Sequence, residues 1–123
     1  MTPELYGDEK NPSAIVVRRN YSVDGIKFFS PPGFSQQIGL MTRPQGYLVP
    51  AHVHNLVERT IHLTQEVLLI RRGSIQVKLF SDSKEVFAEI ILTAGDVILL
   101  AHGGHEILML EEGAAVDLVD RCV

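Results

Sequence analysis

The chain is predicted to be an all-β protein, a sandwich or barrel of antiparallel strands. Its apolar runs are short: "VLLI" and "VILLA" reach four or five residues before a polar residue or a glycine. In "SIQVKLF", Ile75, Val77 and Leu79 alternate with Gln76 and Lys78, which is the period of a half-buried strand. Turn-forming stretches such as "SDSKE" and "TAGD" separate the runs. The chain therefore divides into roughly nine to ten short strands at a spacing of about 8–12 residues.

The expected elements follow one another with little room for a helix. Residues 1–12 contain few apolar side chains and two prolines, so we expect a flexible N-terminal arm or a strand supplied to a partner. Residues 13–123 are expected to form one barrel domain, with "SPPGFS" and "TRPQG" as loops. The strands expected outside the histidine-rich stretch are 14–17, 26–29, 36–41, 67–70, 74–80, 86–92, 97–101, 106–110 and 114–119.

The totals limit the class of protein. A length of 123 residues suits one domain with its own core, and 46% hydrophobic with 21% charged residues is ordinary for a globular chain. The net charge of −4 and the absence of a basic stripe argue against a nucleic-acid partner. No apolar run approaches the ~20 residues of a membrane span. The acidic start lacks a secretory signal and Cys122 is the only cysteine, so we expect a cytoplasmic protein.

Three histidines and one glutamate carry the chemical signal. On a strand, His52 and His54 point to one face about 6.6 Å apart, and neutral imidazole is the commonest transition-metal ligand. Glu66 stands at the head of "VLLI", where both strand faces look buried and an unpaired carboxylate would be costly. His105 shares its parity with apolar Ile107 and follows two glycines. These side chains, from three strands, predict a site for one divalent transition metal: iron, manganese, nickel, zinc or copper.

The same residues resemble the two motifs of the cupin superfamily of small β-barrels. Gly46, five residues and then His52-Val53-His54, followed by Glu66, six residues and Gly73, are similar to the first motif. Gly95-Asp96, leading through "VILLAHGG" to His105, is similar to the second. The resemblance covers about the second two-thirds of the chain. It implies a cupin-type antiparallel barrel (a double-stranded β-helix, or jelly roll) with one divalent metal held by His52, His54, Glu66 and His105.

Two departures from the motifs leave alternatives open. The spacer of eleven residues between His54 and Glu66 is longer than usual, which makes Glu58 a rival carboxylate ligand. Ala101 replaces the usual proline and the second motif is one residue short, which leaves His102 as an alternative to His105. The segments "TQEVLLIRRG" and "GGH" also resemble the sequences of small cupins found with surface-polysaccharide biosynthesis.

Three imidazoles and one carboxylate would leave coordination positions open, as in catalytic rather than structural metal sites. The sequence therefore favours a metal-dependent enzyme acting on a small polar molecule, either a sugar-type isomerase or epimerase or a dioxygenase, although it names no catalytic residue. A non-catalytic module that binds a small ligand or sugar through the metal is the alternative, and a metal-free structural barrel is a third reading. Strand edges of small barrels are often covered by a second subunit, so we expect a homodimer.

Overall fold

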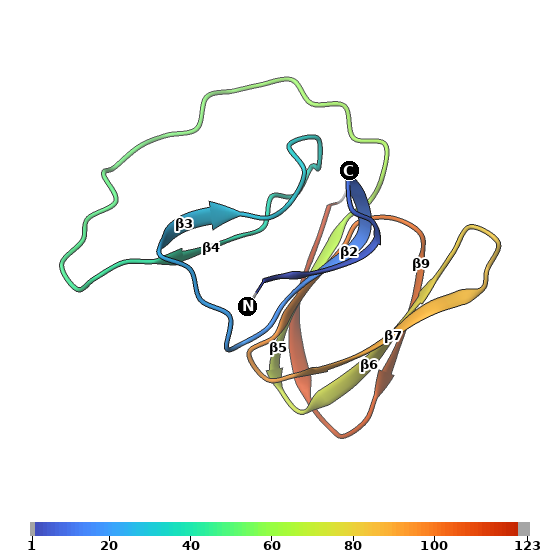
Figure 1. Ribbon diagram of the computed structural model, residues 1–123. Helices are drawn as coiled ribbons and strands as arrows, with labels where there is room; N and C mark the ends of the chain where they lie inside the picture. The colour runs from blue at the N-terminus through green and yellow to red at the C-terminus, as the bar shows by residue number, and fades with distance from the viewer. Residues whose placement is uncertain (1, 121–123) are drawn as a thin grey trace.

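The computed structural model describes residues 2–120, so Cys122 lies outside the described part. That part forms ten β-strands and no helix (Figure 1), which confirms the all-β class predicted from the short, alternating apolar runs. Within it, no helix is long and apolar enough to span a membrane. The strands are β1 (Glu4–Asp8), β2 (Asn11–Val17), β3 (Gly25–Phe28), β4 (Gly39–Thr42), β5 (Glu66–Arg72), β6 (Ser74–Phe80), β7 (Val86–Thr93), β8 (Val97–Leu100), β9 (Gly104–Met109) and β10 (Ala114–Val119).

The strands form three antiparallel sheets. A five-stranded sheet has the order β1-β2-β8-β5-β10, a three-stranded sheet has the order β7-β6-β9, and β3 and β4 form a two-stranded sheet. Strands β9 and β10 follow one another in the sequence but belong to different sheets, and each is the last strand of its sheet. Each therefore keeps one backbone edge without a strand partner among residues 2–120.

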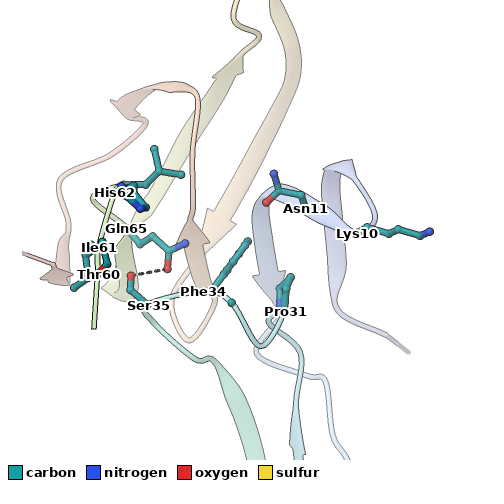
Figure 2. A pocket seen from close by; sticks show the side chains of 11 residues that line it. Lys10, Asn11, Pro31, Phe34, Ser35, Thr60, Ile61, His62 and Gln65 are labelled. Carbon is teal, nitrogen blue, oxygen red and sulfur yellow. Dashed lines mark hydrogen bonds between the residues drawn. The ribbon is translucent and has the colours of Figure 1, made fainter. Parts of the chain in front are cut away.

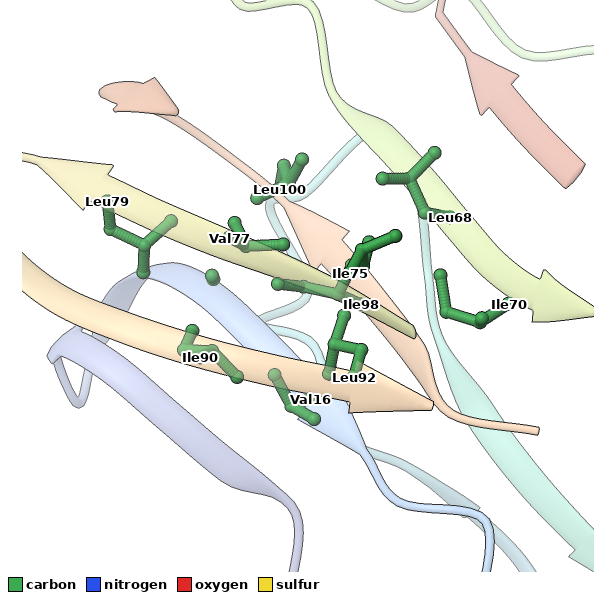
Figure 3. Packing of buried hydrophobic residues seen from close by; sticks show 11 residues of the cluster. Val16, Leu68, Ile70, Ile75, Val77, Leu79, Ile90, Leu92, Ile98 and Leu100 are labelled. Carbon is green, nitrogen blue, oxygen red and sulfur yellow. The ribbon is translucent and has the colours of Figure 1, made fainter. Parts of the chain in front are cut away.

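One apolar core lies between the two larger sheets, as Figure 3 shows. Strand β6 contributes Ile75, Val77 and Leu79, each at most 3% exposed, so its period-two pattern is confirmed. Strand β5 contributes Leu68 and Ile70 from the face that Glu66 shares. The other face of β5 is less buried than its sequence predicts, because Leu69 is 40% exposed there. The remaining core side chains come from β2, β7 and β8: Ala14, Val16, Ile90, Leu92, Ile98 and Leu100.

Gly73 takes the chain from the five-stranded sheet into the three-stranded sheet. Its φ of +82° lies in the left-handed region, which glycine adopts without steric cost. A Cβ atom at this position would also stand 2.8 Å from the Glu112 carbonyl oxygen. Gly73, seven positions after Glu66, is thus required by the tight passage between the sheets.

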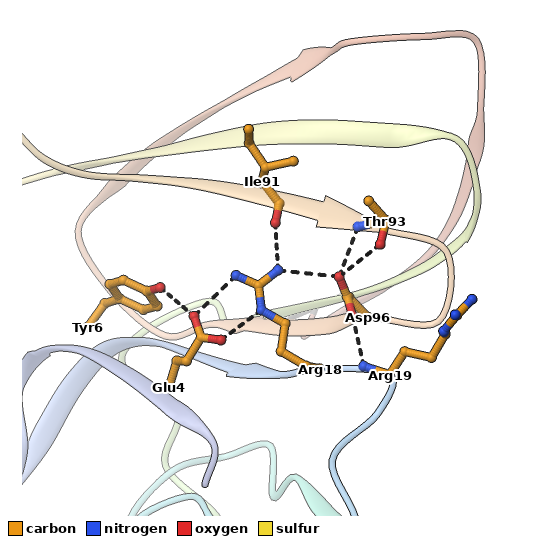
Figure 4. A network of polar contacts seen from close by, with 7 residues as sticks. All are labelled: Glu4, Tyr6, Arg18, Arg19, Ile91, Thr93 and Asp96. Atoms are coloured by element: carbon orange, nitrogen blue, oxygen red, sulfur yellow. Dashed lines mark hydrogen bonds and ion pairs between the residues drawn. The ribbon is translucent and has the colours of Figure 1, made fainter. Parts of the chain in front are cut away.

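A polar network ties the N-terminal strand to both sheets (Figure 4). The Arg18 guanidinium donates from Nε to Glu4 Oε2 at 2.7 Å and from Nη1 to the Ile91 carbonyl at 2.6 Å. Asp96, only 4% exposed, accepts the backbone N–H of Arg19 at 2.8 Å and lies 3.3 Å from Arg18 Nη1. The first twelve residues, expected as an arm, thus include an edge strand, β1, that pairs with β2 of its own chain.

Residues 43–65, between β4 and β5, contain no strand. In Figure 1 this segment, coloured green, arcs away from the two larger sheets. The prediction that His52 and His54 lie on an inward-facing strand is therefore wrong for this structure. An apolar alternation does not make a strand without a neighbour to pair with, and Pro44 and Pro50 each lack an N–H donor.

Candidate functional site

Glu66 lies at the start of β5, where three strands meet. It is paired with Leu100 of β8 on one side and with Val119 of β10 on the other. Its side chain shares the inner face with Leu68, which is 5% exposed, and is itself 21% exposed. The carboxylate therefore stands at the end of the apolar core, where water reaches it only in part.

His105 approaches Glu66 from the other sheet. It is paired with Leu79 of β6, which is 2% exposed, so the imidazole shares the inner face as its parity predicts. Its Nε2 lies 3.3 Å from Glu66 Oε1. Gly103, with a φ of +82°, turns the chain into β9 just before it. Two of the four predicted ligands, more than thirty positions apart in the sequence, thus meet between the sheets.

The surroundings of Glu66 favour its protonated form. Burial raises the pKa of Glu66 to about 7, and the carboxylate of Asp117, on the neighbouring β10, adds to the rise. A positive charge at His105 would act in the opposite direction, because it favours an ionised neighbour. Near neutral pH, this corner holds a carboxyl group that a cation would bring into its charged state.

A small cavity opens beside the Glu66–His105 pair. Its volume is about 190 Å³, and His102 also lines it. The His102 Nε2 lies 2.9 Å from the Asn11 carbonyl oxygen. A carbonyl only accepts, so Nε2 carries the hydrogen and Nδ1 of the neutral ring keeps a free lone pair. The full lining is Thr64, Glu66, Leu100, Ala101, His102, Gly103 and His105.

His52 and His54 lie together on the exposed segment 43–65. Their rings are 5.4 Å apart between centroids and meet edge to face. His52 Nδ1 lies 2.8 Å from the Pro50 carbonyl oxygen, which fixes the hydrogen on Nδ1 and leaves Nε2 of the neutral ring with a free lone pair. Glu58 and His62 are exposed on the same segment. The predicted ligands thus form two pairs, and residues 2–120 contain no group of three or more His, Cys, Asp or Glu side chains placed to hold a metal.

Asp117 is a member of this site that the sequence reasoning did not single out. It is paired with Leu68, so it shares the inner face with Glu66 although it stands on an exposed strand. The signal was present, because Asp117 interrupts "AAVDLV" as Glu66 precedes "VLLI". Only the pairing of β10 with β5 reveals that the two carboxyl groups are neighbours.

Comparisons with known proteins add no relative. Neither a family model, nor a curated protein, nor a solved structure matches this chain.

Proposed function

We propose that this chain is a cupin-type β-barrel protein that binds one divalent transition metal through His52, His54, Glu66 and His105. The bound metal would present open positions to a small polar molecule, and the protein would act on that molecule as an isomerase, an epimerase or a dioxygenase. A module that holds such a molecule without transforming it is the second candidate.

The pairing of Glu66 with His105 is the observation that supports this proposal most. A carboxylate oxygen and an imidazole nitrogen 3.3 Å apart are two donor atoms of the types that iron, manganese, nickel, zinc and copper accept. The high pKa of Glu66 marks a corner that lacks positive charge. Of the rival ligands, Glu58 is exposed on segment 43–65, whereas Glu66 lies beside a histidine.

Segment 43–65 has the length and the donor atoms to complete the ligand set. His54 precedes Glu66 by twelve positions, which span roughly 40 Å when fully extended. The free Nε2 of His52 suits a metal ligand whose other ring nitrogen is held by a carbonyl. We infer that this segment folds back over the site when a metal is bound.

The same movement would close the barrel. The unpaired edges of β9 and β10 border an inner face on which Ile107 is 39% and Met109 49% exposed. Leu48, Val53 and Leu56 of segment 43–65 are more than three-quarters exposed. A strand formed by this segment between β9 and β10 would satisfy backbone groups on both edges and bury apolar side chains on both sides.

The metal would supply Lewis acidity toward a bound oxygen atom or, with iron, nickel or copper, a site for dioxygen. The residues of the chain would hold and orient the small molecule. His102 lines the cavity beside Glu66, and its free Nδ1 is available to accept a proton from a molecule lying there.

Elemental analysis of protein purified without a metal-affinity column tests this function. We expect about one equivalent of a transition metal in the wild-type protein and a strong loss in His52→Ala, His54→Ala, Glu66→Gln and His105→Ala. His62→Ala and Glu58→Gln are matched controls on the same exposed segment and should retain the metal. Because ligand histidines must be neutral, metal content should also fall at acidic pH.

An unchanged metal content in both His52→Ala and His54→Ala would refute the ligand assignment. Oxygen consumption and turnover of a panel of sugar nucleotides and oxo-acids separate the two candidate functions. An enzyme transforms at least one of these molecules, and the four ligand variants lose that activity. A binding module leaves every molecule of the panel unchanged while the wild-type protein still retains its metal.

A further inference from the structure

A second cavity is lined by Gln65, the residue directly before β5. Its volume is about 360 Å³, within the range of roughly 300–1,000 Å³ that is typical of small-molecule pockets. Thr64 and Glu66 line the smaller cavity described above, whereas Gln65 between them lines this one. The other walls come from the turn after β1, from the loop before β4 and from segment 43–65: Lys10, Asn11, Pro31, Gly33, Phe34, Ser35, Thr60, Ile61, His62 and Leu63.

Gln65 is 96% buried, since only 4% of it is exposed, and half of its amide is already engaged. Its Oε1 accepts the backbone N–H of Gln36 at 3.0 Å, and the Ser35 Oγ lies 3.2 Å from it. A backbone N–H can only donate, so this contact fixes which end of the amide is oxygen. Among residues 2–120, the Nε2 of Gln65 then has no hydrogen-bond acceptor.

Figure 2 shows where this unused donor points. The Nε2 end of Gln65 extends into the space that the ring of Phe34 also enters, with Asn11 on the far side. No fully buried side-chain nitrogen or oxygen of residues 2–120 lacks a hydrogen-bond partner, so this N–H₂ group is open to the cavity, where water or a ligand can accept its hydrogens. The pocket therefore presents one well-fixed donor beside one aromatic wall.

The rest of the lining is more apolar than polar and almost uncharged. Thr60 and Asn11 add groups that both donate and accept, while Lys10 extends away from the cavity in Figure 2. Ser35 donates its hydroxyl hydrogen to the carboxylate of Asp120, which places a negative charge behind the wall. An anionic ligand is therefore disfavoured, and an uncharged ring with hydroxyl groups fits both the aromatic wall and the polar edge.

We propose that this cavity binds a neutral, hydroxyl-bearing ring molecule, with one of its oxygens accepting a hydrogen bond from Gln65 Nε2 and one of its faces against Phe34. This site lies outside the proposed metal centre, but Thr60 to Leu63 of its lining belong to segment 43–65, so closure of that segment on a metal would change the pocket. Gln65 precedes Glu66 in the sequence. The consecutive residues Thr64, Gln65 and Glu66 therefore together contribute to the walls of both cavities.

The test is an NMR titration of ¹⁵N-labelled protein with methyl α-D-glucopyranoside, methyl α-D-galactopyranoside and myo-inositol as probes. The Gln65 side-chain amide peaks should shift and saturate with at least one probe. Gln65→Glu keeps the acceptor for Gln36 but removes the donor, so binding should weaken about 5- to 10-fold. Gln76→Glu adds the same charge on β6, away from the pocket lining, and should bind as the wild type does.

The proposal is overturned if no probe gives saturable shifts at Gln65, or if Gln65→Glu binds as tightly as Gln76→Glu. If Gln65→Glu fails to fold, Phe34→Leu and Thr60→Val decide the question, because the first removes the aromatic ring and the second replaces one hydroxyl with a methyl group of similar size. Weaker binding in either supports the site, and unchanged binding in both refutes it. Probe binding that persists in His52→Ala shows that the pocket works without the metal centre.

Discussion

Replacing Glu66 with glutamine should change how the stability of the metal-free protein depends on pH. Folding raises the pKa of Glu66 from 4.5 to about 7, so the folded state holds this proton more tightly than the unfolded state. The resulting stability is full below about pH 4.5 and is lost as the pH rises through about 7. A rise of this size corresponds to at most about 3 kcal/mol. Solvent reaches 21% of the side chain, so the measured value should be smaller.

Urea denaturation at pH 5 and pH 8, with a chelator present, measures this effect. The free energy of unfolding of the wild type should fall by about 1–3 kcal/mol relative to Glu66→Gln between these two values of pH. Glu106→Gln removes the same charge from β9, at the position that follows His105. The pH profile of this control variant should follow that of the wild type. Parallel profiles for the wild type and Glu66→Gln would show that the burial of Glu66 and its closeness to Asp117 do not disfavour its charge.

Three further substitutions test the fold by urea denaturation. Leu92→Ala empties a fully buried core position and should lower the free energy of unfolding by about 2–5 kcal/mol. The hydrogen bond from Arg18 lowers the pKa of the Glu4 carboxyl group, and Glu4→Gln removes this titrating group. The loss of stability as the pH falls below about 4.5 should therefore be smaller in this variant than in the wild type. Gly103→Ala places a Cβ at a φ of +82° and should cost about 1–2 kcal/mol, whereas Gly33→Ala, with open space around it, should cost almost nothing.

The sequence predicted the strands well because each strand carries its own signal. The alternation in "SIQVKLF" and the short runs "AIVV" and "VILLA" identify β6, β2 and β8, and all three are buried where the pattern places them. The inward parity of His105 was likewise a local property of β9. Its contact with Glu66 agrees with the expectation that distant strands bring these two residues together.

What the sequence could not determine was pairing between strands. The approach of Asp117 to Glu66 depends on the register of β10 against β5, and the free amide of Gln65 depends on a loop thirty positions earlier. The arrangement of residues 43–65 is the main difference from expectation. The apolar alternation there favours a strand, but the segment contains prolines and has no neighbouring strand to pair with. Local preference alone therefore did not determine its structure.

The movement inferred for segment 43–65 leads to a prediction about proteolysis. Arg43 and Arg59 are exposed on this segment, and exposed chain outside regular strands is where trypsin cuts first. Adding the metal found by elemental analysis should slow cleavage after Arg59 at least tenfold, because a segment paired between β9 and β10 must open before it is cut. Arg71 and Arg72 lie within β5 and should resist cleavage in both states.

The double variant His52→Ala/His54→Ala separates closure of the segment from general stabilisation by the metal. If the two imidazoles draw the segment over Glu66 and His105, the metal should no longer protect Arg59 in this variant. Protection that survives the double substitution would mean that the segment closes for another reason. Unchanged cleavage of a wild-type protein shown to contain metal would mean that Arg59 stays exposed with the metal bound, which would refute the inferred closure of the segment.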